Sequence, residues 1–332
     1  MIRLIFLILI FQVFSSCSDN NKPTSTTFIA IGDLPNGKKN YQLYEALIKI
    51  INLSKPSLVI HTGDSSNGDE CSNKTIDREY NYMNSFHAPL LFTLGDNDWL
   101  DCPKSDFNSI ERLNYYRQTY FNSGNTLGAK PLKVSNQNES GYPENMFLIK
   151  DNIGFVTLHV VRAIKQMIPL DSESRKEFNL RNEANLVWLE QGFNELNNTD
   201  AIVVTLHANM FESQRLPLKM HAQIIYNNKK LLLNYETYKE LYRSLFGNPD
   251  YKFRLPYRDI GKSIQKLSSD YKKPVLLLHG DTHFHRTIPP SKNFPYLHVI
   301  ETFGDPDIKA IEIIIQPKSK NPFKIERIIN LN

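Results

Sequence analysis

The stretch TFIAIGD, residues 27–33, is a short apolar run that ends abruptly in Gly-Asp. The same pattern returns as SLVIHTGD at 57–64 and as PLLFTLGD at 89–96. Successive aspartates are 31 and 32 residues apart, about the length of one strand–helix unit. Because each run is apolar throughout, we expect three strands whose two faces are both covered.

Helical patterns follow these strands at 41–53, 75–86 and 107–120. Short strands that alternate with helices predict a parallel sheet built by right-handed crossovers. The carboxyl ends of parallel strands meet at one edge of the sheet, which is where open α/β sheets bind ligands. The aspartates that end these strands are therefore expected to lie side by side.

The remainder of the chain reads as a long loop, a hairpin, a further helix and several more strands. We expect the loop at 122–145, a hairpin at 146–161 that turns at Asp151-Asn152, a helix at 182–196, strands at 201–209 and 274–281, and three antiparallel strands at 297–304, 308–316 and 323–331. Between them, residues 209–258 form an insertion rich in Lys, Arg and Tyr, which is either a cationic lid or a solvated helical excursion.

Two of the later strands end in residues of the types that commonly ligate metals. AIVVTLHAN (201–209) reaches His207, and LLLHGDTHFHR (276–286) carries Asp281 and His283. Carboxylates brought together repel one another unless a cation lies among them. Two divalent cations about 3.5–4 Å apart could share a carboxylate and activate a water for in-line attack on phosphorus.

The order of these motifs resembles that of the calcineurin-like metallophosphoesterases. The family pattern is Asp-x-His, Gly-Asp, Gly-Asn-His-Asp/Glu, a lone His and Gly-His-x-His, and the corresponding stretches here are GDLP, HTGD, GDND, LHAN and GDTH. The resemblance covers roughly residues 27–315. It implies an α/β fold, a four-layer αββα sandwich of two mixed β-sheets. It also implies hydrolysis of a phosphate mono- or diester by a metal-activated water, without a covalent enzyme intermediate.

The resemblance assigns metal ligands position by position. The first ion would be held by Asp33 and His283, Asp64 would bridge both ions, and the second ion would be held by Asp96, His207 and Asp281. Such an oxygen-rich set favours Mn, Fe or Mg over Zn.

Three positions depart from the family pattern. Pro35 replaces a histidine ligand, Asn97 replaces the histidine that contacts phosphate, and Asp281 replaces a further histidine. Asparagine can hydrogen-bond a phosphate oxygen but cannot deliver a proton, and general acid catalysis contributes about 10²–10⁴-fold.

We therefore expect a good leaving group or a substitute acid. Candidate catalytic residues are Asn97, Asp98 as a cap or as the carboxylate that orients Asn97, and His279, with His61 and His159 as other sources of the proton. The alternative is that these histidines have structural roles and take no part in catalysis.

The first sixteen residues, MIRLIFLILIFQVFSS, have the charge and short apolar run of a secretory leader. Cys17 follows in a setting that resembles the lipobox of bacterial lipoproteins, where the cysteine is lipidated. Residues 17–25 would then be lipidated cysteine and tether, and 26–332 the metallophosphoesterase domain. This predicts a lipid-anchored protein of the bacterial cell envelope, on the extracytoplasmic side. An ordinary cleaved leader is the alternative.

Composition limits the size of the core and the class of partner but does not indicate a function. The chain has 332 residues, 41% of them hydrophobic, which is enough for a sizeable core. The net charge of +4 comes without a face-long basic block, so nucleic acid is not the expected partner. Outside the cytoplasm, Cys71 and Cys102 are expected to form a disulfide rather than remain free thiols.

A rival from another class is a metallophosphoesterase fold that has lost catalysis and serves as a binding or scaffold lipoprotein. Pro35 and Asn97 favour this rival. The retention of a donor at the other strand ends favours the enzyme.

Overall fold

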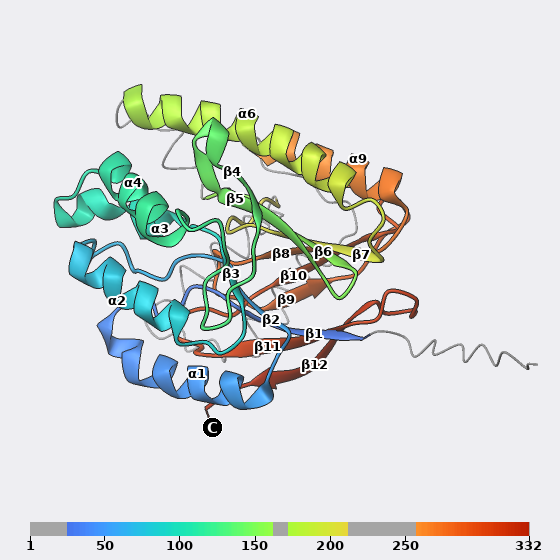
Figure 1. Ribbon diagram of the computed structural model, residues 1–332, viewed down its shortest axis with the longest axis horizontal. Helices are drawn as coiled ribbons and strands as arrows, with labels where there is room; N and C mark the ends of the chain where they lie inside the picture. The colour runs from blue at the N-terminus through green and yellow to red at the C-terminus, as the bar shows by residue number, and fades with distance from the viewer. Residues whose placement is uncertain (1–24, 162–171, 212–256, 332) are drawn as a thin grey trace, which may run out of the picture.

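The computed structural model describes residues 25–161, 172–211 and 257–331. Two mixed β-sheets pack against each other, and helices lie on the outer side of each sheet (Figure 1). The predicted four-layer αββα sandwich is thereby confirmed.

The first sheet has five strands in the order β12-β11-β1-β2-β3. Its strands are β1 (Thr26–Ile31), β2 (Leu58–His61), β3 (Leu90–Phe92), β11 (Ala310–Ile315) and β12 (Phe323–Ile329). The three Gly-Asp strands pair in parallel, as predicted, while β11 and β12 add antiparallel pairs beside β1. All residues of β2 and β3 are buried, in keeping with their continuous apolar character.

The second sheet has seven strands in the order β4-β5-β6-β7-β8-β10-β9. Its strands are β4 (Ser135–Gln137), β5 (Tyr142–Lys150), β6 (Ile153–Thr157), β7 (Ala201–Thr205), β8 (Val275–His279), β9 (Arg286–Ile288) and β10 (Leu297–Glu301). Strands β6, β7, β8 and β10 run parallel to one another, so this sheet also presents a carboxyl edge.

Helices cover the outer face of each sheet. They are α1 (Tyr41–Ser54), α2 (Asn73–Asn84), α3 (Asp96–Trp99), α4 (Ser109–Tyr120), α6 (Ser172–Glu195) and α9 (Arg258–Tyr271), with 3₁₀ turns η1 (Lys38–Asn40), η2 (Cys102–Ser105) and η3 (Asn138–Ser140). Figure 1 shows α6 and α9 side by side over the second sheet, and α1 beneath the first. The start of α2 is fixed by the side chain of Ser72, which accepts a hydrogen bond from the backbone N–H of Thr75.

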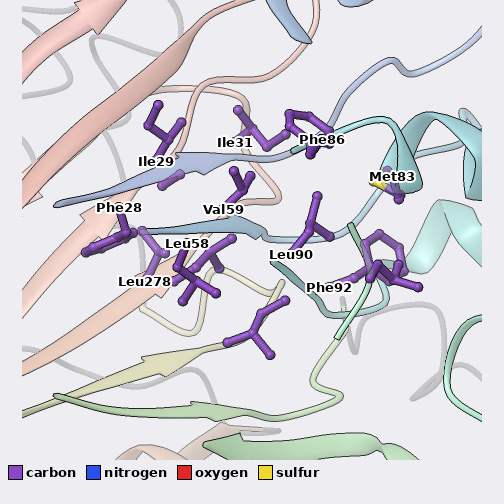
Figure 2. Close-up of a cluster of buried hydrophobic side chains, with 14 of the residues drawn as sticks. Phe28, Ile29, Ile31, Leu58, Val59, Met83, Phe86, Leu90, Phe92 and Leu278 are labelled. Carbon is purple, nitrogen blue, oxygen red and sulfur yellow. The ribbon is translucent and has the colours of Figure 1, made fainter. Parts of the chain in front are cut away.

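The core between the sheets joins strands that lie far apart in the sequence. In Figure 2, Phe28 of β1 and Leu58 of β2 lie close to Leu278 of β8, and all three side chains are fully buried. Phe28 also meets Phe155 of β6 edge to face, with ring centroids 6.1 Å apart. A second cluster, which includes Trp188 and Ile264, packs α6 and α9 onto the second sheet. Burial between the sheets therefore fixes how their carboxyl edges face one another.

Four predictions about local structure need correction. The stretch 122–145 is not all loop, because β4 and the first residues of β5 lie in it. The strand predicted at 297–304 as antiparallel is β10, which pairs in parallel with β8 on one side and antiparallel with β9 on the other. Helix α6 begins ten residues earlier than predicted, and α9 was not predicted.

Part of the domain organisation falls on residues that the structure does not describe. The leader, Cys17 and most of the tether lie there, as does most of the 209–258 insertion. Within the described ranges, no helix combines the length and the apolar character needed to cross a membrane.

Candidate metal centre

The predicted ligands converge at the facing carboxyl ends of strands from both sheets. Two groups each bring three ligand atoms within 4.8 Å of one another: Asp33, Asp64 and His207 in one, and Asp96, His207 and Asp281 in the other. All five of these residues are buried. The two sheets therefore build one compact centre between them.

Sharp turns of the backbone aim several of these side chains at the centre. Asp33, Asp64, Asp281 and His283 have positive φ angles of 52°, 54°, 82° and 63°. This left-handed region is uncommon for residues other than glycine, and such residues cluster at functional sites. Four of the six predicted ligands are thus held in an unfavourable backbone conformation.

Two of the glycines before these aspartates are required by close approach. A Cβ at Gly63, whose φ is +96°, would lie 2.6 Å from the backbone nitrogen of Gly95 and 2.9 Å from Nδ1 of His207. A Cβ at Gly280 would lie 2.6 Å from Oδ2 of Asp33. The Gly-Asp pattern therefore reflects how tightly the strand ends pack.

His207 is held with one ring nitrogen directed to the carboxylates. Its Nδ1 donates to the carbonyl of Thr62 at 2.8 Å. Its Nε2 lies 3.4 Å from Oδ2 of Asp64 and 3.3 Å from Oδ1 of Asp96. The Thr62 contact orients the ring, so that Nε2 is the nitrogen presented to a metal.

His283 is held in the same manner at the other side of the centre. Its Nδ1 lies 2.6 Å from the carbonyl of Asp305, and its Nε2 lies 3.3 Å from Oδ1 of Asp33. Its side chain is 29% exposed, whereas that of His207 is fully buried. His283 is thus the ligand histidine nearest to solvent.

Crowding of carboxylates makes the centre attract positive charge. Burial raises the pKa of Asp64 to about 8, and the charges of Asp96 and Asp33 add to this effect while His207 opposes it. Burial alone would lower the pKa of His207, but the charge and hydrogen bonding of Asp64, with Asp96, raise it well above its ordinary value. For His283, burial is likewise outweighed by Asp33, and the pKa rises to about 9. Without bound cations, these three groups hold protons that offset the negative charge of the crowded carboxylates.

The donor set fits divalent metals. Oδ1 of Asp33 and Nε2 of His207 are buried and, among the described residues, have no hydrogen bond of ordinary geometry. Unsatisfied buried polar atoms are costly and rare in native proteins. Carboxylate oxygens and imidazole nitrogens are common ligands of divalent metals in proteins. The residues present are therefore those that one or two divalent cations would satisfy.

A cavity of about 700 Å³ opens onto this centre. Its lining is Asp64, Asp96, Asn97, Asp281, Thr282, His283, Phe284, Asp305, Pro306 and Asp307. A substrate in the cavity would reach the ligand carboxylates from this side, while Asp33 and His207 lie beneath them.

Comparison with known proteins identifies the family. The sequence model of the calcineurin-like phosphoesterases matches residues 26–284. The chain belongs to this family. No curated protein matches it at a significant level of sequence similarity.

One solved structure supports the fold of this calcineurin-like phosphoesterase. A dimetal phosphatase from Danio rerio shares 10% sequence identity and a TM-score of 0.51, over 88% of this chain and 95% of that one. GAP50, described as the anchor in the inner membrane complex of Plasmodium, shares 11% identity and a TM-score of 0.49, over 93% of this chain and 89% of that one.

The three departures from the family pattern take distinct places in the structure. Pro35 is buried, and its carbonyl accepts a hydrogen bond from Asn40 Nδ2 at 2.8 Å. Asn97 lines the cavity, and its backbone N–H donates to Oδ1 of Asp64 at 2.8 Å. Asp281 reaches the centre, with its Oδ2 also accepting from the backbone N–H of Asn209. Asparagine and aspartate therefore stand where a calcineurin-like phosphoesterase would direct histidines to the site.

Asp98 has the capping role that was one of its two predicted roles, because its side chain accepts a hydrogen bond from the backbone N–H of Gly95, the N-cap of α3. It is fully buried and outside the cavity lining. Its carboxylate accepts hydrogen bonds from the backbone N–H groups of Gly95 at 2.7 Å, Asp64 at 3.0 Å and Ser65 at 2.9 Å. Rather than orienting the Asn97 side chain, Asp98 ties the second Gly-Asp turn to the third.

His279, predicted as a catalytic residue, lies away from the cavity. It is fully buried, lies outside the cavity lining, and places Nδ1 3.0 Å from the carbonyl of Gly280. Burial lowers its pKa to about 3, so it stays neutral.

The other two proposed proton donors are likewise structural. His61 places Nε2 2.7 Å from the carbonyl of Leu34. His159 accepts from Trp99 Nε1 and contacts Glu144 through Nδ1. Burial lowers the pKa of both histidines to about 4. None of the three buried histidines is placed to protonate a leaving group in the cavity.

Sequence reasoning missed two acidic residues beside the centre. Asp305 lines the cavity and supports His283, and it belongs to a further Gly-Asp pair that follows β10. That repetition of the pattern was the available signal. Glu301, the last residue of β10, is fully buried, and burial raises its pKa to about 8 against the pull of Arg286. Its only signal was an acidic residue at the end of an apolar strand.

The predicted disulfide between Cys71 and Cys102 is present, with Cα atoms 5.6 Å apart. It joins the segment after the second Gly-Asp turn to the segment after α3. The disulfide therefore cross-links two segments that lie next to Asn97 at the edge of the cavity.

Proposed function

We propose that this metal-dependent phosphoesterase hydrolyses a phosphate mono- or diester whose leaving group departs without protonation by a histidine. The observation that carries the proposal is the convergence of four carboxylates and two oriented imidazoles beneath an open cavity. Divalent cations bound there would stabilise charge on the phosphoryl oxygens and lower the pKa of the attacking water.

The proposed division of ligands follows the family pattern. Asp33 and His283 lie together and would hold one ion with Asp64. Asp96, His207 and Asp281 form one group of the centre and would hold the other ion. Asp64, which groups with Asp33 and His207, would be shared by both ions. The first set has fewer protein ligands because Pro35 supplies none, and we propose that it binds its ion more weakly.

Asn97 lines the cavity beside the predicted ligand Asp96. Its side-chain amide can donate a hydrogen bond to a phosphate oxygen and so orient the ester. It has no titratable proton to give the departing oxygen. The proposal therefore favours esters of acidic alcohols.

The test is hydrolysis of bis(p-nitrophenyl) phosphate and p-nitrophenyl phosphate by purified protein, with metal content measured on the same samples. We expect Mn²⁺-dependent turnover by wild type, and loss of both turnover and bound metal in Asp64→Asn. Ile149→Thr, a change at an exposed position of β5, is the matched control. Wild-type protein that binds no metal when supplied with Mn²⁺ and is as inert as Asp64→Asn would refute the enzyme.

A second candidate is a catalytically degenerate binding or scaffold protein. It is favoured by the ligand lost at Pro35 and by the burial of the three histidines that could have replaced the missing acid. Thermal melts with Mn²⁺ and with chelator separate the candidates. A cation that binds the native state must raise the midpoint, whereas a scaffold without metal would melt identically in both.

We also propose that Cys17 is lipidated and anchors the chain to the outer side of a bacterial membrane. The polar residues between Cys17 and β1 are suited to a tether. Labelled palmitate should be incorporated by wild type but not by Cys17→Ser, with Cys71→Ser as the control for loss of a cysteine. Equal labelling of wild type and Cys17→Ser would exclude lipidation at this residue.

A further inference from the structure

The turn that carries Asp281 and His283 closes around a buried carboxylate, that of Glu301. Oε1 of Glu301 accepts hydrogen bonds from the backbone N–H of Thr282, at 3.2 Å, and from the Thr282 hydroxyl. Thr282 is the one residue between the two predicted ligands. The side chain of Glu301 is fully buried, so these bonds are made away from solvent.

The same glutamate also holds the far end of the turn. Its Oε2 lies 2.6 Å from Nε of Arg286, the first residue of β9, and its carbonyl lies 2.7 Å from Nδ1 of His285. In the sheet, Glu301 is paired with His279 on one side and Arg286 on the other. Glu301 therefore contacts the middle of the turn from β8 to β9, at Thr282, and its far end, at His285 and Arg286.

Such attachment is needed because the turn is strained. Asp281 and His283 both adopt positive φ, a conformation that is unfavourable for residues other than glycine. Ligands must be placed to within about 0.2 Å to bind a metal well. A turn free to relax would not keep both side chains aimed at the centre.

We infer that Glu301 is a positioning residue, which sets the spacing of Asp281 and His283 and thereby the affinity for both cations. The inference rests on the two-metal centre of the proposed function. Both Glu301 and Arg286 lie beyond residues 26–284, the part of the chain that matches the family.

The test compares Mn²⁺ binding by Glu301→Gln, Thr282→Val and wild type, using calorimetry on full-length protein stripped with chelator. All contacts to the Glu301 carboxylate come from donors, so an amide must lose either Thr282 or Arg286. Outer-shell partners contribute about 10–100-fold to metal affinity, and we expect a loss of that size in Glu301→Gln. Thr282→Val, which removes only the hydroxyl contact, should weaken binding in the same direction.

Glu144→Gln is the matched control. Glu144 is a fully buried carboxylate of the second sheet, with its Oε1 2.6 Å from Nη2 of Arg117. Its substitution should lower the melting midpoint of metal-free protein while leaving Mn²⁺ affinity unchanged. A purely structural role for Glu301 would give the same result as Glu144→Gln.

Each outcome bears on a separate claim. Wild-type Mn²⁺ affinity in folded Glu301→Gln would overturn the inference while leaving the two-metal centre in place. If Glu301→Gln fails to fold, wild-type affinity in Thr282→Val has the same meaning. Wild type that binds no Mn²⁺ would overturn the proposed function, and the inference with it.

Discussion

Adding one methyl group at Gly95 should abolish tight metal binding. Gly95 has φ −100° and ψ 179°, extended values that alanine adopts without strain. The new Cβ would lie 2.5 Å from the backbone nitrogen of Asp64 and 2.7 Å from its Cγ, and it would overlap Oδ1. Ordinary contacts of a Cβ begin near 3.4 Å, so Asp64 must retreat by roughly 0.7–0.9 Å. Rotating the side chain cannot relieve the contact with the backbone nitrogen.

This displacement is several times the tolerance of about 0.2 Å in metal–ligand distances. Because Asp64 is the proposed shared ligand, we expect Mn²⁺ affinity to fall by more than the roughly 100-fold upper range for outer-shell changes. Overpacking should cost about 1–3 kcal/mol of folding stability. Calorimetry of Gly95→Ala, with melts in Mn²⁺ and in chelator, measures both effects.

Gly192→Ala is the control, since Gly192 lies on α6 and an added Cβ there would meet only side chains, at 3.2 Å or more. It should keep wild-type Mn²⁺ affinity. A folded Gly95→Ala protein with wild-type Mn²⁺ affinity would show that the strand ends do not constrain Asp64 in the way argued.

Further expectations concern the leaving group, pH, the disulfide and substrate charge. Asn97→His should raise kcat for esters of poor leaving groups at least about tenfold, towards the 10²–10⁴-fold contribution of a general acid, with little change for p-nitrophenyl esters. The folded-state pKa values of His61 and His159 are about 4. Unfolded histidine titrates near 6.5, so the unfolded state binds more protons between these values. The contribution of these two histidines to stability is therefore complete above pH 6.5 and falls by about 1.4 kcal/mol per pH unit for each histidine towards pH 4, as urea titrations of wild type compared with variants that lack either histidine would measure. Replacing Cys71 and Cys102 by serine should lower the free energy of unfolding by about 3–4 kcal/mol, and an unchanged urea midpoint would contradict this. Finally, kcat/KM should favour the diester over the monoester.

Features that depend on neighbours in sequence were the ones that could be predicted. A strand that is apolar on both faces and ends in Gly-Asp is predicted to be buried, with its aspartate at the carboxyl edge of the sheet. For this reason the amino-acid pattern alone was enough to place Asp33, Asp64 and Asp96 together. His207 followed from the same reasoning, because it ends a strand of the same kind.

Side-chain direction within the motifs could not be predicted in this way. Asn97 and Asp98 are adjacent, but α3 turns each residue by about 100° from the last. Asn97 consequently faces the cavity while Asp98 faces the turns beneath it. The parallel pairing of β10 with β8 was missed for a related reason, since the direction of a pairing depends on the chain that connects the strands.

The balance of charge explains why a diester is the better substrate to expect. The four aspartates Asp33, Asp64, Asp96 and Asp281 match the charge of two divalent cations, so the occupied centre is about neutral. The family pattern has only two aspartates among its ligands and leaves two positive charges. A centre without that excess attracts a phosphate monoester dianion less strongly, whereas a diester carries one negative charge and loses less. The replacement of histidine by Asp281 would therefore alter substrate preference as well as the choice of metal. A monoester preference in the loaded protein would show that cationic groups elsewhere in the chain restore the missing charge.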